Sequence, residues 1–311
     1  MKSRVKISAL WTPISPASTI KLHHGRGNRP RRITLHDGKQ RLAVFWDDRH
    51  NTAAIVDDTC QHRGVSLSSG RVDRGCVVCP YHGRKTTPND DRVTIADGIV
   101  WYNDPTFESS ETSTHTSWEF EQGQRICIYE RRFPGCNPVY TLENTIDWEH
   151  LRHVHLFSFT RGDPEVIIHE DGTAASYVYS TAVPGHVLEV ENQFWTNASC
   201  LRFRFGPRDA AREDREVYFS IHSAFVPVGK RDTTVILRVA RRRLAWLGPL
   251  GDLVMMASNE LPIIEDRAIL QTIPHDHTWR HDTLSREDGF IGAFRDHLRN
   301  TVPGMVELYC M

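Results

Sequence analysis

Two short segments decide the fold of this chain: Cys60-Gln61-His62-Arg63-Gly64 and Cys79-Pro80-Tyr81-His82-Gly83. The first carries a Cys-x-His pair and the second a Cys-x-x-His pair, with sixteen residues between His62 and Cys79. Each segment ends in a glycine next to strand-like sequence, which indicates a tight loop between strands. Two such loops can converge and bring two cysteines and two histidines to one site.

This donor set fits an iron–sulfur cluster better than a structural zinc ion. A [2Fe-2S] centre with Cys60 and Cys79 on one iron and His62 and His82 on the other needs this inventory, and neutral imidazoles raise its reduction potential above that of an all-cysteine cluster. Zinc also accepts two cysteines and two histidines. Zinc fingers, however, place like ligands in each half, whereas each loop here mixes one Cys with one His. Cys76 forms a Cys-x-x-Cys pair with Cys79, and we interpret it as an inert strand residue.

The two segments resemble the Rieske domain of the ring-hydroxylating and O-demethylating oxygenases. The resemblance also includes Ser68-Ser69-Gly70, which lies between them. It implies that Cys60, His62, Cys79 and His82 bind the [2Fe-2S] cluster. One departure is Arg84, where the family usually has a tryptophan, and this change bears on the packing beside the cluster and on the docking of an electron donor.

A second block, from Glu143 to His155, crowds carboxylates and imidazoles together. On a helix Asp147 and His150 share a face, because they are three residues apart. His150 and His155 are five apart and diverge unless the helix bends or ends there. We expect such a break, because it lets both imidazoles meet one metal. Two histidines and one carboxylate that leave open positions on Fe(II) suit the activation of dioxygen.

The spacing Asp-x-x-His-x-x-x-x-His resembles the mononuclear iron motif of the same oxygenases. The resemblance implies that His150 and His155 bind the iron and that Asp147 bridges to the Rieske cluster. It places the third ligand, an aspartate, on a late helix. Asp266 stands at that position, and Glu265 is its main competitor.

The neighbours of these residues have more than one interpretation. Asp147 is suited to accept the N–H of a ligating histidine, as residues around metal ligands commonly do. Asn144 either serves near the iron or has an ordinary role as a helix cap or surface amide. We interpret His153 as a packing residue, and Glu143 and Glu149 as surface charges.

Composition narrows the classes of function. The 38 Lys and Arg residues nearly cancel the 39 Asp and Glu residues, which predicts no binding to nucleic acid or to an anionic membrane. No apolar stretch reaches the roughly 20 residues that a transmembrane helix needs. Seven cysteines do not form a dense disulfide framework, and the N-terminus lacks the apolar region of a secretory signal. We expect a cytoplasmic protein that acts on a small organic substrate.

The pattern of elements predicts an α+β protein with two domains, residues 1–107 and 119–311. A β-meander is expected from Arg32 to Asp57, a buried strand from Gly98 to Tyr102, and a polar linker from Glu108 to Trp118. The second domain begins with a helical block from Leu142 to Leu156 and continues with period-two strands between Glu165 and Ala240. Apolar residues at helical spacing predict helices from Leu250 to Ile273 and from Glu287 to Arg299.

The resemblance extends from about Trp11 through Asp282-Thr283-Leu284 to the last helix. It implies a Rieske β-domain, a helix-grip-like antiparallel sheet that holds the iron, and a ring-shaped homotrimer in which the cluster of one subunit serves the iron of the next. It also implies a monooxygenase or demethylase, with a cis-dihydroxylating dioxygenase as the alternative. A mere electron carrier with an inactive iron site would not need His150, His155 and Asp266 together.

The sequence contains no Gly-x-Gly-x-x-Gly segment that opens a βαβ unit. A separate NAD(P)H-dependent reductase, with or without a ferredoxin, is therefore expected to supply the electrons. We expect the segment from Glu165 to Arg238 to form most of the substrate pocket. The sequence does not show which of Phe194, Trp195 and Phe219 faces a substrate, and such aromatic residues are more often core than pocket residues.

Overall fold

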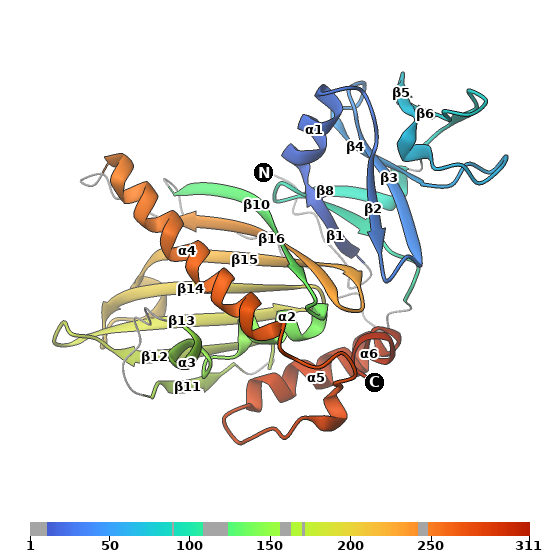
Figure 1. Cartoon of the computed structure of the whole chain (residues 1–311). Helices are drawn as coiled ribbons and strands as arrows, with labels where there is room; N and C mark the ends of the chain where they lie inside the picture. The colour runs from blue at the N-terminus through green and yellow to red at the C-terminus, as the bar shows by residue number, and fades with distance from the viewer. Residues whose placement is uncertain (1–10, 89, 108–123, 156–162, 170–171, 242–247) are drawn as a thin grey trace.

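The computed structural model describes residues 11–88, 90–107, 124–155, 163–169, 172–241 and 248–311. Three small antiparallel sheets form the N-terminal part, and one large antiparallel sheet with helices against it forms the C-terminal part (Figure 1). The expected α+β class, with a small β-domain followed by a helix-grip-like sheet and flanking helices, is confirmed. The predicted linker from Glu108 to Trp118 lies outside the described residues, so the two domain boundaries stay predictions.

The N-terminal part pairs its strands in the orders β1-β9-β8, β2-β3-β4 and β5-β6-β7. The meander β2-β3-β4 confirms the one expected from Arg32 to Asp57. Strand β9 is the buried strand expected from Gly98 to Tyr102. Helix α1 was not expected from the sequence. The bounds are β1 (Trp11–Pro16), α1 (Ala17–Gly25), β2 (Arg31–Leu35), β3 (Gln40–Asp47), β4 (Thr52–Asp57), β5 (Arg71–Asp73), β6 (Cys76–Val78), β7 (Lys85–Thr86), β8 (Val93–Ala96) and β9 (Ile99–Asn103), with short 3₁₀ turns at Leu67–Ser69 and Asp90–Arg92.

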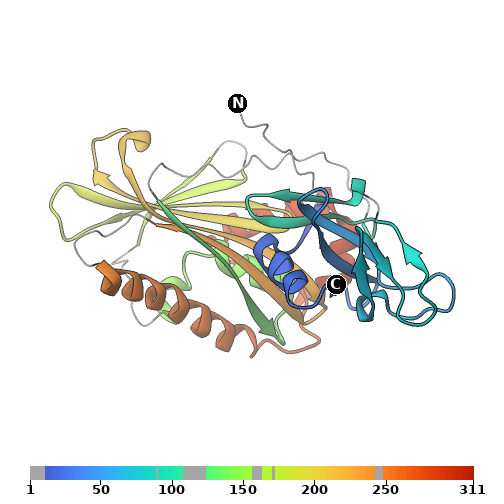
Figure 2. The same ribbon diagram turned by 90° about the horizontal axis from the view of Figure 1, so that it is seen from above.

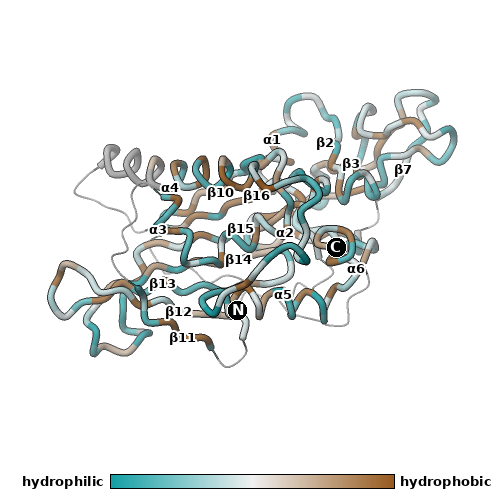
Figure 3. Tube along the Cα trace, turned by 60° about the horizontal axis from the view of Figure 1, so that its bottom comes forward, coloured by the Kyte–Doolittle hydropathy of each residue, from teal (hydrophilic) through white to brown (hydrophobic). Residues whose placement is uncertain are grey.

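The C-terminal sheet has seven antiparallel strands in the order β10-β16-β15-β14-β13-β12-β11. All the predicted strands between Glu165 and Ala240 are present, most of them longer at one or both ends than expected. Strand β11 forms one edge of the sheet, and its side chains Val166, Ile167 and Ile168 are 45–48% exposed (Figure 3). The bounds are β10 (Arg125–Pro134), β11 (Glu165–Ile168), β12 (Ala174–Ser180), β13 (His186–Trp195), β14 (Ala198–Pro207), β15 (Glu216–Gly229) and β16 (Asp232–Arg241).

Helices cover one face of this sheet. The longest, α4, runs across that face, and α2 lies on the same side, while α5 and α6 pack at the end nearer the N-terminal part (Figures 1 and 2). A single core of buried side chains joins these helices to the sheet. The bounds are α2 (Pro138–Ile146), α3 (Leu151–Val154), α4 (Gly248–Leu270), α5 (Gly289–Thr301) and α6 (Pro303–Tyr309), with 3₁₀ turns at Arg212–Asp214 and Trp279–His281.

The two parts share a hydrophobic core. Ala198, Ala224 and Ile236 of the large sheet are fully buried in the same cluster as Ile99 and Tyr102 of the N-terminal part. Burial of this apolar surface fixes the N-terminal part against the sheet.

The expected helical block from Leu142 to Leu156 is wrong in its extent. Helix α2 begins earlier, at Pro138, because the side chain of Asn137 caps it by accepting hydrogen bonds from the backbone N–H groups of Val139 (2.8 Å) and Tyr140 (3.4 Å). It ends at Ile146, and only the short helix α3 follows. The expected break in this block is therefore present, and Leu156 lies outside the described residues.

Within the described ranges, no helix is both long and apolar enough to cross a membrane. The cytoplasmic location expected from the sequence stays a prediction.

Candidate cluster and metal sites

The two Cys/His segments form a pair of equivalent loops. In the first, the N–H of Cys60 donates to the C=O of Val65 (2.9 Å) and the N–H of Gly64 donates to the C=O of Cys60 (2.8 Å). The second repeats both bonds, from Cys79 to Arg84 (2.8 Å) and from Gly83 to Cys79 (3.1 Å). Two loops of the same geometry thus present the same donor types to one point.

Each loop turns at its glycine. Gly64 has a φ of 71° and Gly83 a φ of 68°, in the left-handed region that favours glycine. A Cβ on either residue would meet no atom within 4 Å, so the backbone angle and not lack of space requires glycine here.

The histidine and cysteine side chains of the two loops lie at different depths. The Nδ1 atoms of His62 and His82 lie 3.2 Å apart on the exposed tip, whereas Cys60 and Cys79 are buried at 5% and 3% exposure behind them. Hydrogen bonds from the backbone of Tyr81 and then of His82, together with one from Cys60, hold the pKa of the Cys79 thiol below its usual value although burial opposes this. A thiol whose thiolate form is favoured is prepared to bind iron.

Arg84 is exposed next to this tip. The pKa of His62 lies below its usual value because of partial desolvation and, after it, the positive charge of Arg84. The residue that departs from the family pattern therefore places a cation beside a candidate cluster ligand.

The second site lies between α3 and α4. His150, His155 and Asp266 each offer one ligand atom, and these atoms lie within 4.8 Å of one another. Asp266 Oδ1 is 3.5 Å from Nε2 of His150 and 3.5 Å from Nε2 of His155. Two ligands bound at about 2.1 Å to one metal lie roughly 3 to 3.4 Å apart, so the two sides of the triangle that include Asp266 are already close to the separation that an ion requires.

The helix is interrupted after α2, and this interruption lets the two histidines approach each other. Asp147 ends α2 with an extended ψ of 121°, and its carboxylate accepts the N–H of Glu149 (2.8 Å), which closes a turn. His150 then precedes α3 and His155 follows it, so that their ring centroids lie 5.2 Å apart. A continuous helix would have directed the two imidazoles to different faces.

Several carboxylates hold the imidazoles. Burial disfavours the charged form of His150, but Asp147, whose Oδ2 is 3.6 Å from Nδ1, and the charge of Asp266 outweigh it and raise the pKa of His150. Glu265 Oε2 lies 3.0 Å from Nδ1 of His155. Glu265 therefore contacts the ring nitrogen that faces away from Asp266, which is the position of an orienting partner and not that of a competing ligand.

Asn144, on the last turn of α2, lies close enough to Asp266 to oppose a rise in the pKa of that carboxyl group. Burial nevertheless raises the pKa of Asp266, because the charged carboxylate has lost water. Asn144 thus lies at the candidate metal site, which favours the first of its two sequence-based interpretations. Asp147 lies next to His150, and its bridging role stays a prediction.

The donor set and its unsatisfied atoms fit a metal ion. Asp266 Oδ1 is buried with no hydrogen-bond partner among the described residues, and the two Nε2 atoms face it. A buried carboxylate oxygen without a partner is costly unless a cation satisfies it. Two histidines and one carboxylate on one side of the ion suit Fe(II) with open positions.

Two of the neighbouring residues differ from expectation. His153 is exposed and lies outside the metal triangle, so its interpretation as a packing residue is wrong. Glu143 is buried at 5% exposure and pairs with Arg295, so its interpretation as a surface charge is wrong too. Sequence reasoning missed Arg295, and no local signal marks it, because its partner is 152 residues away. Glu149 is half-buried.

Comparisons with known proteins agree with this geometry. The family model of the Rieske [2Fe-2S] domain matches residues 11–95. The phthalate 4,5-dioxygenase oxygenase subunit of Pseudomonas putida is 24% identical over 171 residues, which are 48% of this chain and 37% of that protein. The chain spans well under half the length of the curated relatives it matches.

Solved structures share the fold over nearly the whole chain. The Pseudomonas putida CBB5 NdmA QL mutant with caffeine matches with a TM-score of 0.70 and 18% identity, over 92% of this chain and 88% of that one. The crystal structure of dicamba monooxygenase matches with a TM-score of 0.68 and 14% identity, over 96% and 97%. The chain therefore contains a Rieske [2Fe-2S] domain, and its fold is that of the Rieske oxygenase α subunits.

Proposed function

We propose that this chain is the catalytic subunit of a Rieske non-heme iron oxygenase that hydroxylates or oxidatively demethylates a small organic substrate. One observation carries the proposal: a Rieske domain occurs in the same chain as a partly buried triangle of His150, His155 and Asp266. An electron carrier needs only the first of these sites.

In this proposal Cys60, His62, Cys79 and His82 hold the cluster, and His150, His155 and Asp266 hold the iron. The iron, when bound, activates dioxygen at the positions that the three protein ligands leave open. Glu265 orients the ring of His155 through Nδ1, and the carboxylate of Asp147 lies 3.6 Å from Nδ1 of His150. Asn144 lies beside the carboxylate of Asp266.

The reaction balances with two electrons from outside. One C–H bond, one O2, two electrons and two protons give one C–OH and one water. If the hydroxylated carbon is a methyl group on oxygen or nitrogen, the product loses it as formaldehyde. A reductase, with or without a ferredoxin, supplies the electrons through the cluster, because the Rieske tip exposes His62 and His82.

Electron transfer is proposed to run between neighbouring subunits of a homotrimer. The cluster loops beside β5 and β6 lie far from α3 and the metal triangle, as two views agree (Figures 1 and 2). Asp147, which touches His150 and keeps a 26% exposed side chain, is the residue through which the cluster of a neighbour is reached. The exposed apolar edge β11 is consistent with assembly.

The substrate is expected to be mainly apolar. Leu201, Phe203, Phe219 and Ile221 pack toward the helix-side core but stay only partly buried. The charged residues of β14, such as Arg202, alternate with them and point to the other face of the sheet. Phe194, in contrast, is a core residue, as expected.

Cis-dihydroxylation remains a second candidate, because a matching relative is named a dioxygenase subunit. Labelled dioxygen discriminates between the two. A hydroxylase places one labelled atom in the product and one in water, whereas a dihydroxylase places both atoms in the product.

The first test is iron and acid-labile sulfide per chain on anaerobically purified protein, with low-temperature EPR after dithionite reduction. The proposal expects about three irons and two sulfides, and a signal of the low average g that His-ligated clusters give. Two irons with that signal would reduce the protein to an electron carrier. Zinc without sulfide would overturn the proposal altogether.

A further inference from the structure

Helix α2 carries residues of the metal site but no metal ligand. Its last turn supplies Asn144, which lies beside Asp266, and the C=O of Glu143 accepts the N–H of Asp147 (3.0 Å). Any rotation of α2 would therefore move both residues relative to the metal triangle. What holds α2 in place is thus part of the geometry of the site.

A buried ion pair ties α2 to the C-terminal helix α5. Nε and Nη2 of Arg295 donate to the two carboxylate oxygens of Glu143, at 2.8 and 2.9 Å. Both side chains are only 6% exposed. A bidentate guanidinium–carboxylate pair fixes orientation as well as distance, because both bonds are lost if either group turns.

Arg295 is itself held from the other side. Its Nη2 bonds to Asp282 Oδ2 (2.5 Å), and its guanidinium lies 4.8 Å from the ring centroid of Trp279. The hydroxyl of Tyr140, also on α2, donates to the same Asp282 oxygen (3.3 Å). Asp282 and Trp279 therefore hold the guanidinium in place independently of Glu143.

The first turn of α2 is fixed by α6. Nδ2 of Asn137, the N-cap of α2, donates to the C=O of Tyr309 (2.6 Å). The C-terminal helices thus contact α2 at its start and, through Arg295, next to Asn144.

We propose that Arg295 is a positioning residue of the iron site, which acts through Glu143 to hold Asn144 and Asp147 in register with Asp266 and His150. This inference rests on the proposed function. Arg295 touches no ligand, and its chemistry is orientation. Loss of residues that orient metal ligands typically weakens metal affinity by roughly 10- to 100-fold.

The test compares full-length Arg295→Met and Glu143→Gln with wild type, each reconstituted with iron under anaerobic conditions. Mononuclear iron loss to a ferrous chelator is followed with time, and the ferrous–nitric oxide complex of the site is examined by EPR. We expect at least about tenfold faster iron loss and an altered nitric oxide spectrum in both variants, with the EPR signal of the reduced cluster unchanged.

Two controls on α5 separate positioning from stability. Arg299→Met removes a neighbouring arginine that also stacks on Trp279 but bonds to exposed Asp296, and it should leave iron loss at the wild-type rate. Leu298→Ala removes a fully buried apolar side chain from the same helix, and so lowers the melting temperature without removing a polar contact to α2.

If Leu298→Ala releases iron as fast as Arg295→Met at a similar melting temperature, the effect is merely structural and the inference fails. It also fails if Arg295→Met and Glu143→Gln keep iron as wild type does. If Arg295→Met does not fold, Glu143→Gln, which preserves shape, decides. A wild type that takes up no mononuclear iron would instead overturn the proposed function.

Discussion

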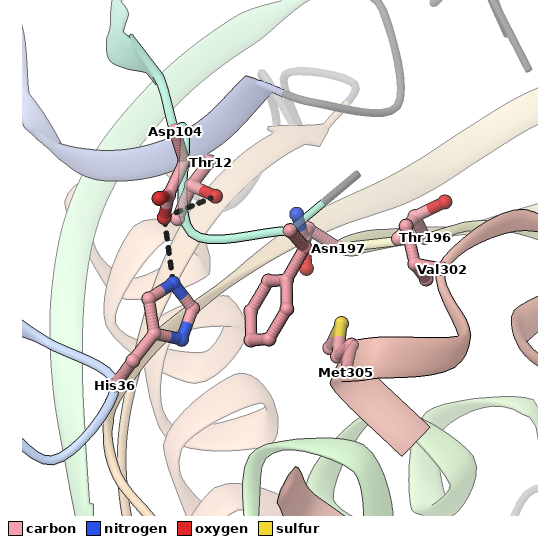
Figure 4. A pocket seen from close by; sticks show the side chains of 8 residues that line it. Thr12, His36, Asp104, Thr196, Asn197, Val302 and Met305 are labelled. Carbon is pink, nitrogen blue, oxygen red and sulfur yellow. Dashed lines mark hydrogen bonds and ion pairs between the residues drawn. The ribbon is translucent and has the colours of Figure 1, made fainter. Parts of the chain in front are cut away.

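Asp104 lies in a buried hydrogen-bond chain at the junction between the Rieske domain and the C-terminal helices. Its Oδ2 accepts from Nε2 of His36 (2.6 Å), and its Oδ1 accepts from the N–H of Thr106 (2.9 Å). The tautomer of His36 follows, since Nδ1 is then free to accept from the hydroxyl of Tyr309 (2.8 Å). Figure 4 shows His36 and Asp104 facing each other beside Thr12. The perturbation is Asp104→Asn, which keeps the shape and removes the charge.

The size of the expected stability loss follows from the burial of both partners. Asp104 and His36 are 3% and 1% exposed, so neither finds water as a substitute partner. A buried hydrogen bond to a charged group contributes about 1.5 to 3 kcal/mol. We expect Asp104→Asn to lower the free energy of unfolding by about 2 kcal/mol at pH 7. Asp48→Asn is the matched control, because its His24 pair at 3.0 Å has a 75% exposed carboxylate and should contribute less than about 1 kcal/mol.

The effect should depend on pH in one direction. Burial opposes ionisation of Asp104, but the bonds from His36 outweigh it and hold its pKa below the usual 3.8. A carboxylate with a lowered folded-state pKa stabilises the fold above its unfolded pKa and loses that contribution as pH falls. The difference in the free energy of unfolding between wild type and Asp104→Asn should therefore have its full size above about pH 5 and become smaller at lower pH.

The assay is urea unfolding of the metal-loaded protein, followed by fluorescence and circular dichroism. A double-mutant cycle with Tyr309→Phe should give a coupling energy above about 0.5 kcal/mol, because His36 bonds to both partners. The reasoning is refuted if Asp104→Asn costs no more than Asp48→Asn, or if its cost grows as the pH is lowered.

Three further changes test the candidate sites. Asp266→Ala should lose the mononuclear iron but keep the cluster, seen as a fall from about three irons per chain to two at constant sulfide, and an unchanged iron count would remove Asp266 from the ligand set. Asp147→Asn should retain iron within roughly tenfold of wild-type affinity but slow re-oxidation of the reduced cluster in a single turnover, and a wild-type rate would argue against its bridging role. Gly83→Ala should cost about 1 to 2 kcal/mol and lower cluster absorbance per chain, whereas Gly185→Ala, at a similar φ of 72° far from the cluster loops, should leave that absorbance unchanged.

The cluster loops were predictable because their information is local. The spacing of Cys60, His62, Cys79 and His82, with a glycine closing each loop, constrains the chain within twenty-four residues of sequence. The strands of the meander β2-β3-β4 follow equally local rules, with turn residues at the two bends. The structure adds that the two loops repeat the same backbone hydrogen bonds, which spacing alone does not reveal.

The metal site was predictable only in part. A break that lets His150 and His155 meet was expected, but its position before His150 was not, because neither proline nor glycine marks it. The break occurs where the carboxylate of Asp147 bonds to the N–H of Glu149, and such local bonds compete with helix formation. Glu143 shows the limit most clearly. Its neighbours in sequence suggest solvent, and only packing of α5 against α2 buries it beside Arg295.

The shared core gives a physical reason to favour electron transfer between subunits. The N-terminal part cannot swing toward α3 without exposing the buried residues that it shares with β14, β15 and β16. Exposing that apolar surface would cost about 25 cal/mol for each Å², and the Asp104–His36–Tyr309 chain would break as well. In the proposed mechanism, a cluster held this firmly away from its own metal triangle is expected to serve the triangle of another chain. The Asp104→Asn variant measures how much one bond of this junction contributes to stability, and a firm junction is what the proposed transfer to a neighbouring subunit requires.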